Sequence, residues 1–286
     1  MNLFKIGLAF AVAALIVGTG TVAGLFWHFS HGLPDHKQLA DYQPPITSRL
    51  YAADGRLLAE YAKERRVFVP AAAIPRRVKQ AFVAAEDQRF YTHPGVDILG
   101  IVRAVAANIA NPGRRMEGAS GITQQVAKNF LLSNQATLAR KIREAILAFR
   151  IEEAYSKEHI LELYLNEIYL GAGNYGVAQA AMNYFDRSLG ELSLSEIAYL
   201  AALPKAPSQL HPFRQRDRAV ERRNYVLDQM AITGEIKPAE ADKWKKEPLT
   251  VTARPTGAHI FAAEYFAEEV RRWVYEKYGE KALYEG

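Results

Sequence analysis

A run of uncharged, mostly apolar residues at the start of the chain limits its fold more than any other feature. Residues 6–27 contain only Ile, Leu, Val, Phe, Ala, Gly, Thr and Trp. A helix of about 20 such residues, rising ~1.5 Å per residue, spans a hydrocarbon core of ~30 Å. Lys5 precedes the run and Trp27 ends it, where a membrane helix often carries an aromatic anchor. The sequence therefore predicts one transmembrane helix.

A cleaved secretory signal is the alternative interpretation of this run. The apolar region of such a signal usually has about 7–15 residues, and this run is longer. No clear small-x-small cleavage site precedes Phe26. We therefore favour an uncleaved anchor within residues 1–30. Lys5 favours a cytoplasmic N-terminus and an exported remainder.

Composition narrows the class of the remaining chain. A length of 286 residues fits one or two domains of about 100–200 residues, and a hydrophobic content of 49% excludes general disorder. The net charge of +5 is modest and suits a polyanionic partner. The chain has no cysteine, which excludes disulfides, thiolate metal sites and cysteine nucleophiles.

Helical patterns dominate the chain beyond the proline-containing linker at residues 31–47. Asp54-Gly55 lies between two apolar runs and predicts a β-hairpin. Ser193 and Glu196 have the spacing of a capping box, and Gly279 follows the last periodic stretch. The predicted helices cover residues 76–90, 97–110, 121–132, 137–154, 157–169, 175–185, 194–202, 214–232, 238–246 and 258–278. The expected fold is mainly α with a small β-hairpin.

The first candidate for chemistry is the segment E-D-Q-R-F-Y-T-H-P-G at residues 86–95. Acidic side chains at the end of an apolar helix are poorly placed for the helix dipole, which favours cations there. A carboxylate at the mouth of an apolar surface has a raised pKa, as a general base requires. The alternative is a solvated helix end followed by a Pro-Gly turn.

The second candidate is the segment G-A-S-G-I-T-Q-Q-V-A-K-N at residues 118–129. Small residues at a helix start let an anion approach the backbone N–H groups. Gln125, Lys128 and Asn129 are spaced to share one helix face, which could bind a phosphate or sugar hydroxyls. An ordinary capped amphipathic helix explains the same pattern.

The third candidate is R-K-I-R-E at residues 140–144. Four apolar residues recur at helical spacing and are predicted to face the core: Leu138, Ile142, Ala145 and Phe149. Arg140 and Glu144 then share another face. They form either an ordinary ion pair that contributes about 0.3–0.5 kcal/mol, or a carboxylate beside cations that bind an anionic leaving group.

Other parts of the sequence carry less chemistry. The segment 157–185 contains Y-L-N at residues 164–166 and three glycines in residues 171–176, for which we favour a structural role. The seven histidines lack metal-ligand spacing, and phosphate-loop, dinucleotide and serine-hydrolase motifs are absent from the sequence. Paired arginines are scattered rather than striped, so nucleic-acid binding is not expected.

Taken in order, these segments resemble the family 51 glycosyltransferases, the peptidoglycan glycosyltransferase domain. The matching patterns are E-D-x-x-F-x-x-H-x-G from Glu86, a G-G-S-T-I-T-Q-Q-like stretch from Gly118, R-K-x-x-E from Arg140 and K-x-x-I-L-x-x-Y-L-N from Lys157. The resemblance covers roughly residues 48–232. It implies a lysozyme-like, two-lobed helical domain at residues 48–250, with the smaller lobe partly embedded in the membrane. It also implies that lipid II is the substrate.

The resemblance assigns roles to particular residues. Glu86 matches the catalytic base and Glu144 the second catalytic acidic residue. The residues expected to shape the cleft or bind substrate are Asp87, Phe90, His93, Ser120, Gln125, Lys128, Asn129, Arg140 and Lys141. No metal site and no required cofactor are expected, although a divalent cation, Mg²⁺ or Mn²⁺, could assist at the pyrophosphate.

The family pattern is matched with two departures, and two alternative functions stay open. Ala119 and Gly121 replace the usual Gly and Thr, and Ala136 stands where the family usually has an arginine that faces phosphate. The alternatives are a lysozyme-like cell-wall hydrolase, which would use water as its nucleophile, and a catalytically weak scaffold that binds lipid II.

The sequence also predicts the surroundings of the domain. Ser-x-x-Lys and Lys-Thr-Gly are absent, and residues 251–286 resemble the connector helix that leads to the transpeptidase domain of class A penicillin-binding proteins. We therefore expect the N-terminal part of such a protein, with a naturally monofunctional enzyme as the alternative, in the bacterial inner membrane and with a periplasmic catalytic domain. The expected partners are lipid II, the growing glycan strand, membrane lipid and cell-wall synthesis proteins.

Overall fold

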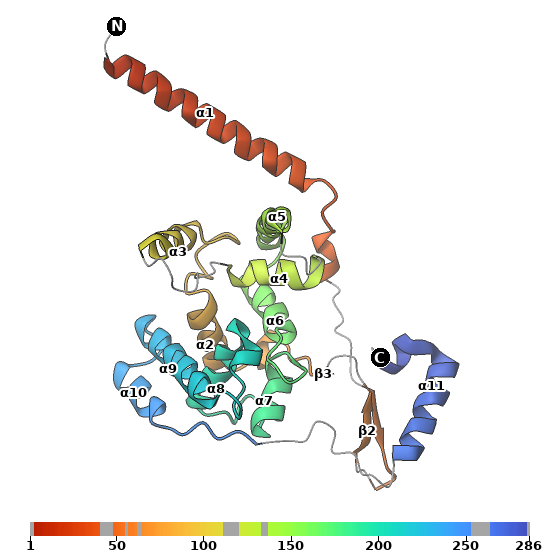
Figure 1. Cartoon of the computed structure of the whole chain (residues 1–286). Helices are drawn as coiled ribbons and strands as arrows, with labels where there is room; N and C mark the ends of the chain where they lie inside the picture. Colours follow the sequence, from red (N-terminus) through yellow and green to blue (C-terminus); the bar gives the residue numbers. More distant parts are fainter. Residues whose placement is uncertain are drawn as a thin grey trace. The chain divides into compact units, whose positions relative to one another are not determined.

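The computed structural model describes residues 3–40, 48–54, 57–61, 65–110, 120–132, 137–252 and 264–284 (Figure 1). The chain divides into two compact units. The first unit comprises Met1–Ala40 and His93–Tyr155, and the second comprises Asp41–Thr92 and Ser156–Gly286. Helices make up most of the described residues, so the predicted mainly α fold class is confirmed.

The predicted helices have clear counterparts. The first unit contains α1 (Leu3–Ser30), the short 3-10 helix η1 (His36–Leu39), α3 (Ile98–Ala110), α4 (Ile122–Leu131) and α5 (Leu138–Ala154). The helices of the second unit are α2 (Arg76–Glu86), α6 (Lys157–Glu167), α7 (Val177–Phe185), α8 (Leu194–Ala202), α9 (Arg216–Ile232), α10 (Pro238–Lys245), α11 (Glu264–Tyr284) and the 3-10 helices η2 (Ala71–Ala73), η3 (Leu203–Lys205) and η4 (Pro207–Gln209).

The apolar N-terminal run lies within α1. Among the described residues, no helix combines the length and the apolar character that a membrane crossing requires. The transmembrane anchor therefore stays a prediction.

The predicted linker contains ordered structure. Asp35 caps η1 by accepting a hydrogen bond from the Lys37 N–H at 2.9 Å. Leu39 is only 2% exposed, and the Tyr155 hydroxyl at the end of α5 donates to the His36 carbonyl at 2.9 Å. The segment that follows α1 is thus built into the first unit.

The prediction of which face of α5 is buried is wrong. Leu138 is 79% exposed and Phe149 38% exposed, although both were predicted to face the core. The buried positions of α5 instead include Glu144, Leu147, Ala148 and Ile151, which follow the i, i+3, i+4, i+7 pattern. A carboxylate therefore takes a core position, and its paired cations make that burial tolerable.

The core of the second unit forms where α2, α8 and α9 pack together (Figure 1). Phe82 of α2, Leu200 of α8 and Val226 of α9 are fully buried. Arg223 of α9 is 1% exposed, and its guanidinium donates to the carbonyls of Lys245 at 2.9 Å and Glu247 at 2.6 Å. Because these carbonyls lie at and just beyond the end of α10, the buried cation fixes this helix end on α9.

The predicted hairpin is present, and a second small sheet was not predicted. Strands β1 (Ser48–Tyr51) and β2 (Leu57–Tyr61) pair antiparallel on either side of Asp54-Gly55. Strands β3 (Arg65–Arg66) and β4 (Asn174–Tyr175) pair in parallel. At two residues each, these strands are too short to show the alternation that predicts a strand.

The glycine-rich turn before α7 has the structural role predicted for it. Gly176 has a φ of 78°, and a Cβ there would lie 2.6 Å from the Asn166 carbonyl oxygen at the end of α6. The Asn166 side chain also holds Val69, since its Nδ2 donates to the Val69 carbonyl and its Oδ1 accepts from the Val69 N–H, both at 2.8 Å. Glycine is required here by both conformation and space.

Two helix ends differ from the prediction by more than three residues. Helix α2 ends at Glu86 rather than at residue 90, because Asp87 adopts a non-helical conformation (φ −155°, ψ 74°). Helix α11 continues to Tyr284, but Gly279 has a φ of 83°, which breaks the helix at the predicted stop. The predicted start of this helix at residue 258 lies outside the described residues.

Candidate active site

The strongest polar constellation of the first unit lies in the first turns of α5. Thr137 caps this helix by accepting a hydrogen bond from the Arg140 N–H at 3.1 Å, which places Arg140 and Lys141 in the first turn. Cations are unfavourable at a helix N-terminus. Glu144 compensates them, since Arg140 Nη1 lies 2.8 Å from its Oε1 and Lys141 Nζ lies 2.8 Å from its Oε2. We call Arg140, Lys141 and Glu144 the Glu144 cluster.

Burial makes the Glu144 cluster more than a surface ion pair. The side chain of Glu144 is 2% exposed, that of Arg140 19% and that of Lys141 45%. The Arg140 Nη1 N–H is not directed at Glu144 Oε1, so this close contact is an ion pair rather than a hydrogen bond. Arg140 Nε is buried and has no hydrogen-bond partner among the described residues. Two cations on one carboxylate leave an excess positive charge, which suits an anionic ligand.

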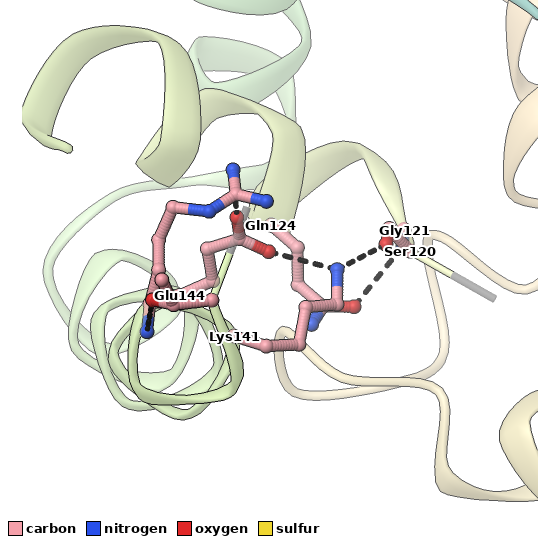
Figure 2. A network of polar contacts seen from close by, with 7 residues as sticks. Ser120, Gly121, Gln124, Lys141 and Glu144 are labelled. Carbon is pink, nitrogen blue, oxygen red and sulfur yellow. Dashed lines mark hydrogen bonds and ion pairs between the residues drawn. The ribbon is translucent and has the colours of Figure 1, made fainter. Parts of the chain in front are cut away.

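Lys141 connects the cluster to the start of α4 (Figure 2). Its Nζ lies between Glu144 Oε2 and Ser120 Oγ and donates to both. At the same helix start, Gln124 Oε1 accepts from the Gly121 N–H at 3.2 Å. Glycine offers no side chain for the reciprocal bond of a capping box. The predicted residues Ser120 and Lys141 are therefore in direct contact.

Helix α4 presents the predicted polar face. Gln125 and Lys128 are half-buried and Asn129 is exposed, whereas most other positions of this helix are buried. Among the buried polar residues, Thr123 donates from its hydroxyl to Glu152 Oε1 of α5 at 2.5 Å. This hydrogen bond fixes α4 against α5.

The second half of the segment 86–95 is built into the first unit. His93 is 4% exposed. Gly95 has a φ of 96°, and a Cβ there would lie 2.6 Å from the Ala148 carbonyl oxygen of α5. The last glycine of the motif thus lets the loop that carries His93 approach the backbone of α5 closely.

Glu86 is the last residue of α2, in the second unit. It is half-buried, and Asp87 beside it is 6% exposed. The Phe90 N–H donates to the Asp87 carbonyl at 2.9 Å and closes a turn after the helix. Phe90 is fully buried, and Lys157 Nζ lies 4.5 Å from the centre of its ring. The predicted residues Glu86, Asp87 and Phe90 therefore belong to one helix end and its turn.

Tyr164 of α6 lies near this helix end and was not predicted as a site residue. Its side chain is 1% exposed, and burial raises the pKa of its hydroxyl well above the usual value. The negative charges of Glu86 and Asp87 raise that pKa further. The only sequence signal for this residue is its place in the Y-L-N motif, for which the sequence favours a structural role.

Metal ligands were not predicted for this chain. Within the part of the chain that the structure describes, no group of three or more His, Asp or Glu residues could hold a metal ion.

Comparison with known proteins identifies the family. A family model described as Transglycosylase matches residues 54–231, which is more than half of the chain. The chain belongs to the transglycosylase family. All four sequence segments that carry the candidate site, from Glu86 to Asn166, lie inside the matched region.

Relatives of this family cover nearly the whole chain. The sequence is 51% identical over 262 residues to penicillin-binding protein 1A of Rickettsia felis, covering 91% of this chain and 33% of the relative. It is 43% identical over 286 residues to penicillin-binding protein 1A of Escherichia coli K12, covering 100% of this chain and 33% of the relative. The chain thus spans about a third of the length of these relatives.

A solved structure supports the same assignment. The crystal structure of penicillin-binding protein 1A from Haemophilus influenzae matches with a TM-score of 0.51 and 29% identity, over 85% of this chain and 26% of that chain. The predicted family and the predicted enzyme class, a peptidoglycan glycosyltransferase domain, are confirmed. The roles of the individual site residues stay predictions.

Proposed function

We propose that this chain polymerises lipid II into β-1,4-linked glycan strands, with inversion at the donor sugar and release of undecaprenyl pyrophosphate. The observation that carries the proposal is the Glu144 cluster, a buried carboxylate that holds two cations 2.8 Å away, inside the region matched by the transglycosylase family. A pyrophosphate leaving group requires positive charge rather than a proton donor.

The cations of the first unit stabilise the leaving group. Arg140 and Lys141 are held by Glu144, and Lys128, a half-buried residue of α4, adds a third cation. Guanidinium and ammonium groups form strong charge-assisted hydrogen bonds to phosphate oxygens. In this proposal Glu144 acts by orienting these cations.

Glu86 acts as the general base. It removes the proton from the acceptor sugar hydroxyl while that oxygen forms a bond to the donor's anomeric carbon. The bond from this carbon to the pyrophosphate breaks, and its electron pair leaves with the phosphate. Attack from the opposite face converts the α-linked donor into a β-1,4 link. General-base catalysis of this kind contributes about 10²–10⁴-fold in rate.

The proposal includes the membrane. We propose that α1 holds the chain in the inner membrane, with the N-terminus inside and the catalytic domain in the periplasm, because lipid II is itself a membrane lipid. Exposed apolar side chains on α3 support contact between the first unit and lipid: Ile98, Leu99, Val102 and Ile109. Fractionation of cells that express the chain with and without residues 1–30 tests the anchor.

The decisive experiment is a polymerisation assay with purified lipid II in detergent or vesicles. We expect glycan strands to lengthen and undecaprenyl pyrophosphate to be released. Digestion of finished cell wall with release of reducing ends would instead show a hydrolase, and binding of lipid II without turnover would show a scaffold. Addition of EDTA, followed by Mg²⁺ or Mn²⁺, tests whether a divalent cation assists at the pyrophosphate.

A further inference from the structure

The hydroxyl of Tyr164 is an exception among the buried tyrosines of the second unit. The hydroxyl of Tyr184 donates to the Leu170 carbonyl at 2.8 Å, and that of Tyr199 donates to the Leu210 carbonyl at 3.0 Å. Tyr164 is as buried as these, yet its hydroxyl has no hydrogen-bond partner among the described residues. An unpaired buried hydroxyl destabilises a fold, so it calls for an explanation.

The charges around Tyr164 indicate which acceptor would suit it. Glu86 and Asp87 both act electrostatically on its hydroxyl, and both raise its pKa. The hydroxyl therefore keeps its proton and remains a donor. Carboxylate oxygens are the strongest acceptors that a protein offers to such a donor.

Packing fixes Tyr164 against the helix that carries the base. Its ring makes an edge-to-face contact with Phe82, with centroids 6.3 Å apart. Phe82 precedes Glu86 by four residues on α2 and therefore lies on the same helix face. At the other end of α6, Lys157 covers the ring of Phe90 in the turn after the base. One helix thus contacts the chain on both sides of Glu86.

We propose that Tyr164 is a positioning residue for Glu86, whose carboxylate accepts a hydrogen bond from the buried Tyr164 hydroxyl when substrate is bound. Occupation of one carboxylate oxygen by this bond directs the other oxygen at the acceptor hydroxyl. The proton removed from the acceptor goes to that second oxygen, and Tyr164 keeps its own proton. The inference rests on the proposed function, because it assumes that Glu86 is the base.

The experiment compares Tyr164→Phe with Tyr199→Phe in the full chain. Both variants keep the ring and remove one buried hydroxyl. Loss of a hydrogen bond to a charged group corresponds to about tenfold in rate, so we expect Tyr164→Phe to lower kcat for lipid II polymerisation about tenfold and to leave KM within about twofold. Its Tm should stay equal or rise, since an unpaired hydroxyl is removed. Tyr199→Phe should keep kcat and lower the Tm.

The combination of a slower but no less stable enzyme is the signature of a positioning role. A Tyr164→Phe chain with unchanged kcat, or with kcat and Tm lowered together, would overturn the proposal. Glu86→Gln, measured in parallel, distinguishes a failure of the positioning role from a failure of the proposed function. If Glu86→Gln is inactive and Tyr164→Phe is fully active, only the positioning role fails. If the unaltered chain does not polymerise lipid II, or if Glu86→Gln remains active, the proposed function fails and the role of Tyr164 fails with it.

Discussion

Glu86 and Glu144 are the same kind of side chain in opposite surroundings. Glu144 is buried in α5 and lies 2.8 Å from both a guanidinium and an ammonium group. Glu86 ends α2, half-buried beside a second carboxylate, Asp87, and near the buried hydroxyl of Tyr164. A carboxylate fixed between cations serves to hold positive charge, whereas we propose that the carboxylate at the end of α2 takes the proton of the acceptor hydroxyl. The difference predicts different effects of the same substitution.

Glu86→Gln should have the largest effect on activity and almost none on stability. Loss of the general base should lower polymerisation of lipid II by about 10²-fold or more. The free energy of unfolding should change by less than about 0.5 kcal/mol, since the side chain is only half-buried. Kinetics and urea unfolding measure the two quantities, and Glu158→Gln, exposed on α6, is the matched control. Retained polymerisation would refute the base assignment.

Glu144→Gln should lower stability and activity together. The substitution leaves the mostly buried guanidinium of Arg140 without its counter-charge, and breaking a buried pair costs about 3 kcal/mol. Misplaced cations should also weaken donor binding. Glu153→Gln, exposed on the same helix, should change neither quantity. A Glu144→Gln chain of normal stability would show that the cluster is not held together by charge.

Removal of Arg140 and Lys141 one at a time should separate their contributions to binding of the lipid II donor. Arg140→Ala should raise KM for the lipid II donor about tenfold, which corresponds to about 1.4 kcal/mol of binding. Lys141→Ala should have a smaller effect, because its side chain is 45% exposed and its charge is better screened. Steady-state kinetics of the two variants, measured side by side, tests this order. Equal increases in KM would contradict the claim that the more buried cation contributes more to donor binding.

Lys128→Ala tests whether α4 contributes to the same binding function. We expect KM for the donor to rise by about threefold to tenfold, in line with one charge-assisted hydrogen bond. The stability should stay close to that of the unaltered chain, because Lys128 is only half-buried. Unchanged kinetics would count against a phosphate-binding role.

Glu191 is a surface carboxylate that can be compared with Glu86 and Glu144. Its substitution should have the smallest effect on stability. Hydrogen bonds from the Ser188 hydroxyl and N–H lower the pKa of Glu191 below its ordinary value of 4.5. A carboxylate whose pKa is lower in the folded state stabilises the fold above pH 4.5 and loses this contribution as the pH falls through the lowered pKa. Glu191→Gln should therefore be slightly less stable at neutral pH and closer to the unaltered chain in acid. The urea concentration at the midpoint of unfolding, measured for both chains at neutral pH and in acid, gives the difference in stability.

Much of the fold could be predicted because short-range sequence signals agree with the helices and strands that the chain forms. Helical periodicity, the Ser193 capping box and the Asp54-Gly55 turn are short-range signals, and the elements that they predicted are present. In the capping box, the Ser193 N–H donates to Glu196 Oε2 at 2.7 Å, and the Glu196 N–H donates to Ser193 Oγ at 3.3 Å. The pairing of Arg140 with Glu144 also follows from spacing along one helix.

The failures involve partners that are distant in sequence. Helix α5 has two candidate faces, and periodicity favoured the one with Leu138 and Phe149. Which face is buried depends on whether Glu144 is neutralised, and one of its two cations, Lys141, donates in turn to Ser120 just before α4. The environment of Tyr164 likewise depends on where α2 ends. Sequence patterns therefore identified the types of residue in the site but not their burial.

The burial of Leu39 and the hydrogen bond from the Tyr155 hydroxyl to the His36 carbonyl fix η1 on α5, so only residues 31–35 connect η1 to the end of α1. Fully stretched, such a segment reaches about 17 Å. The end of α1 is therefore held within that distance of η1, and α1 itself contacts α5 of the same unit. Replacement of α1 by another helix should preserve this connection as long as residues 31–39 are kept, whereas an insertion between Ser30 and Asp35 would lengthen it.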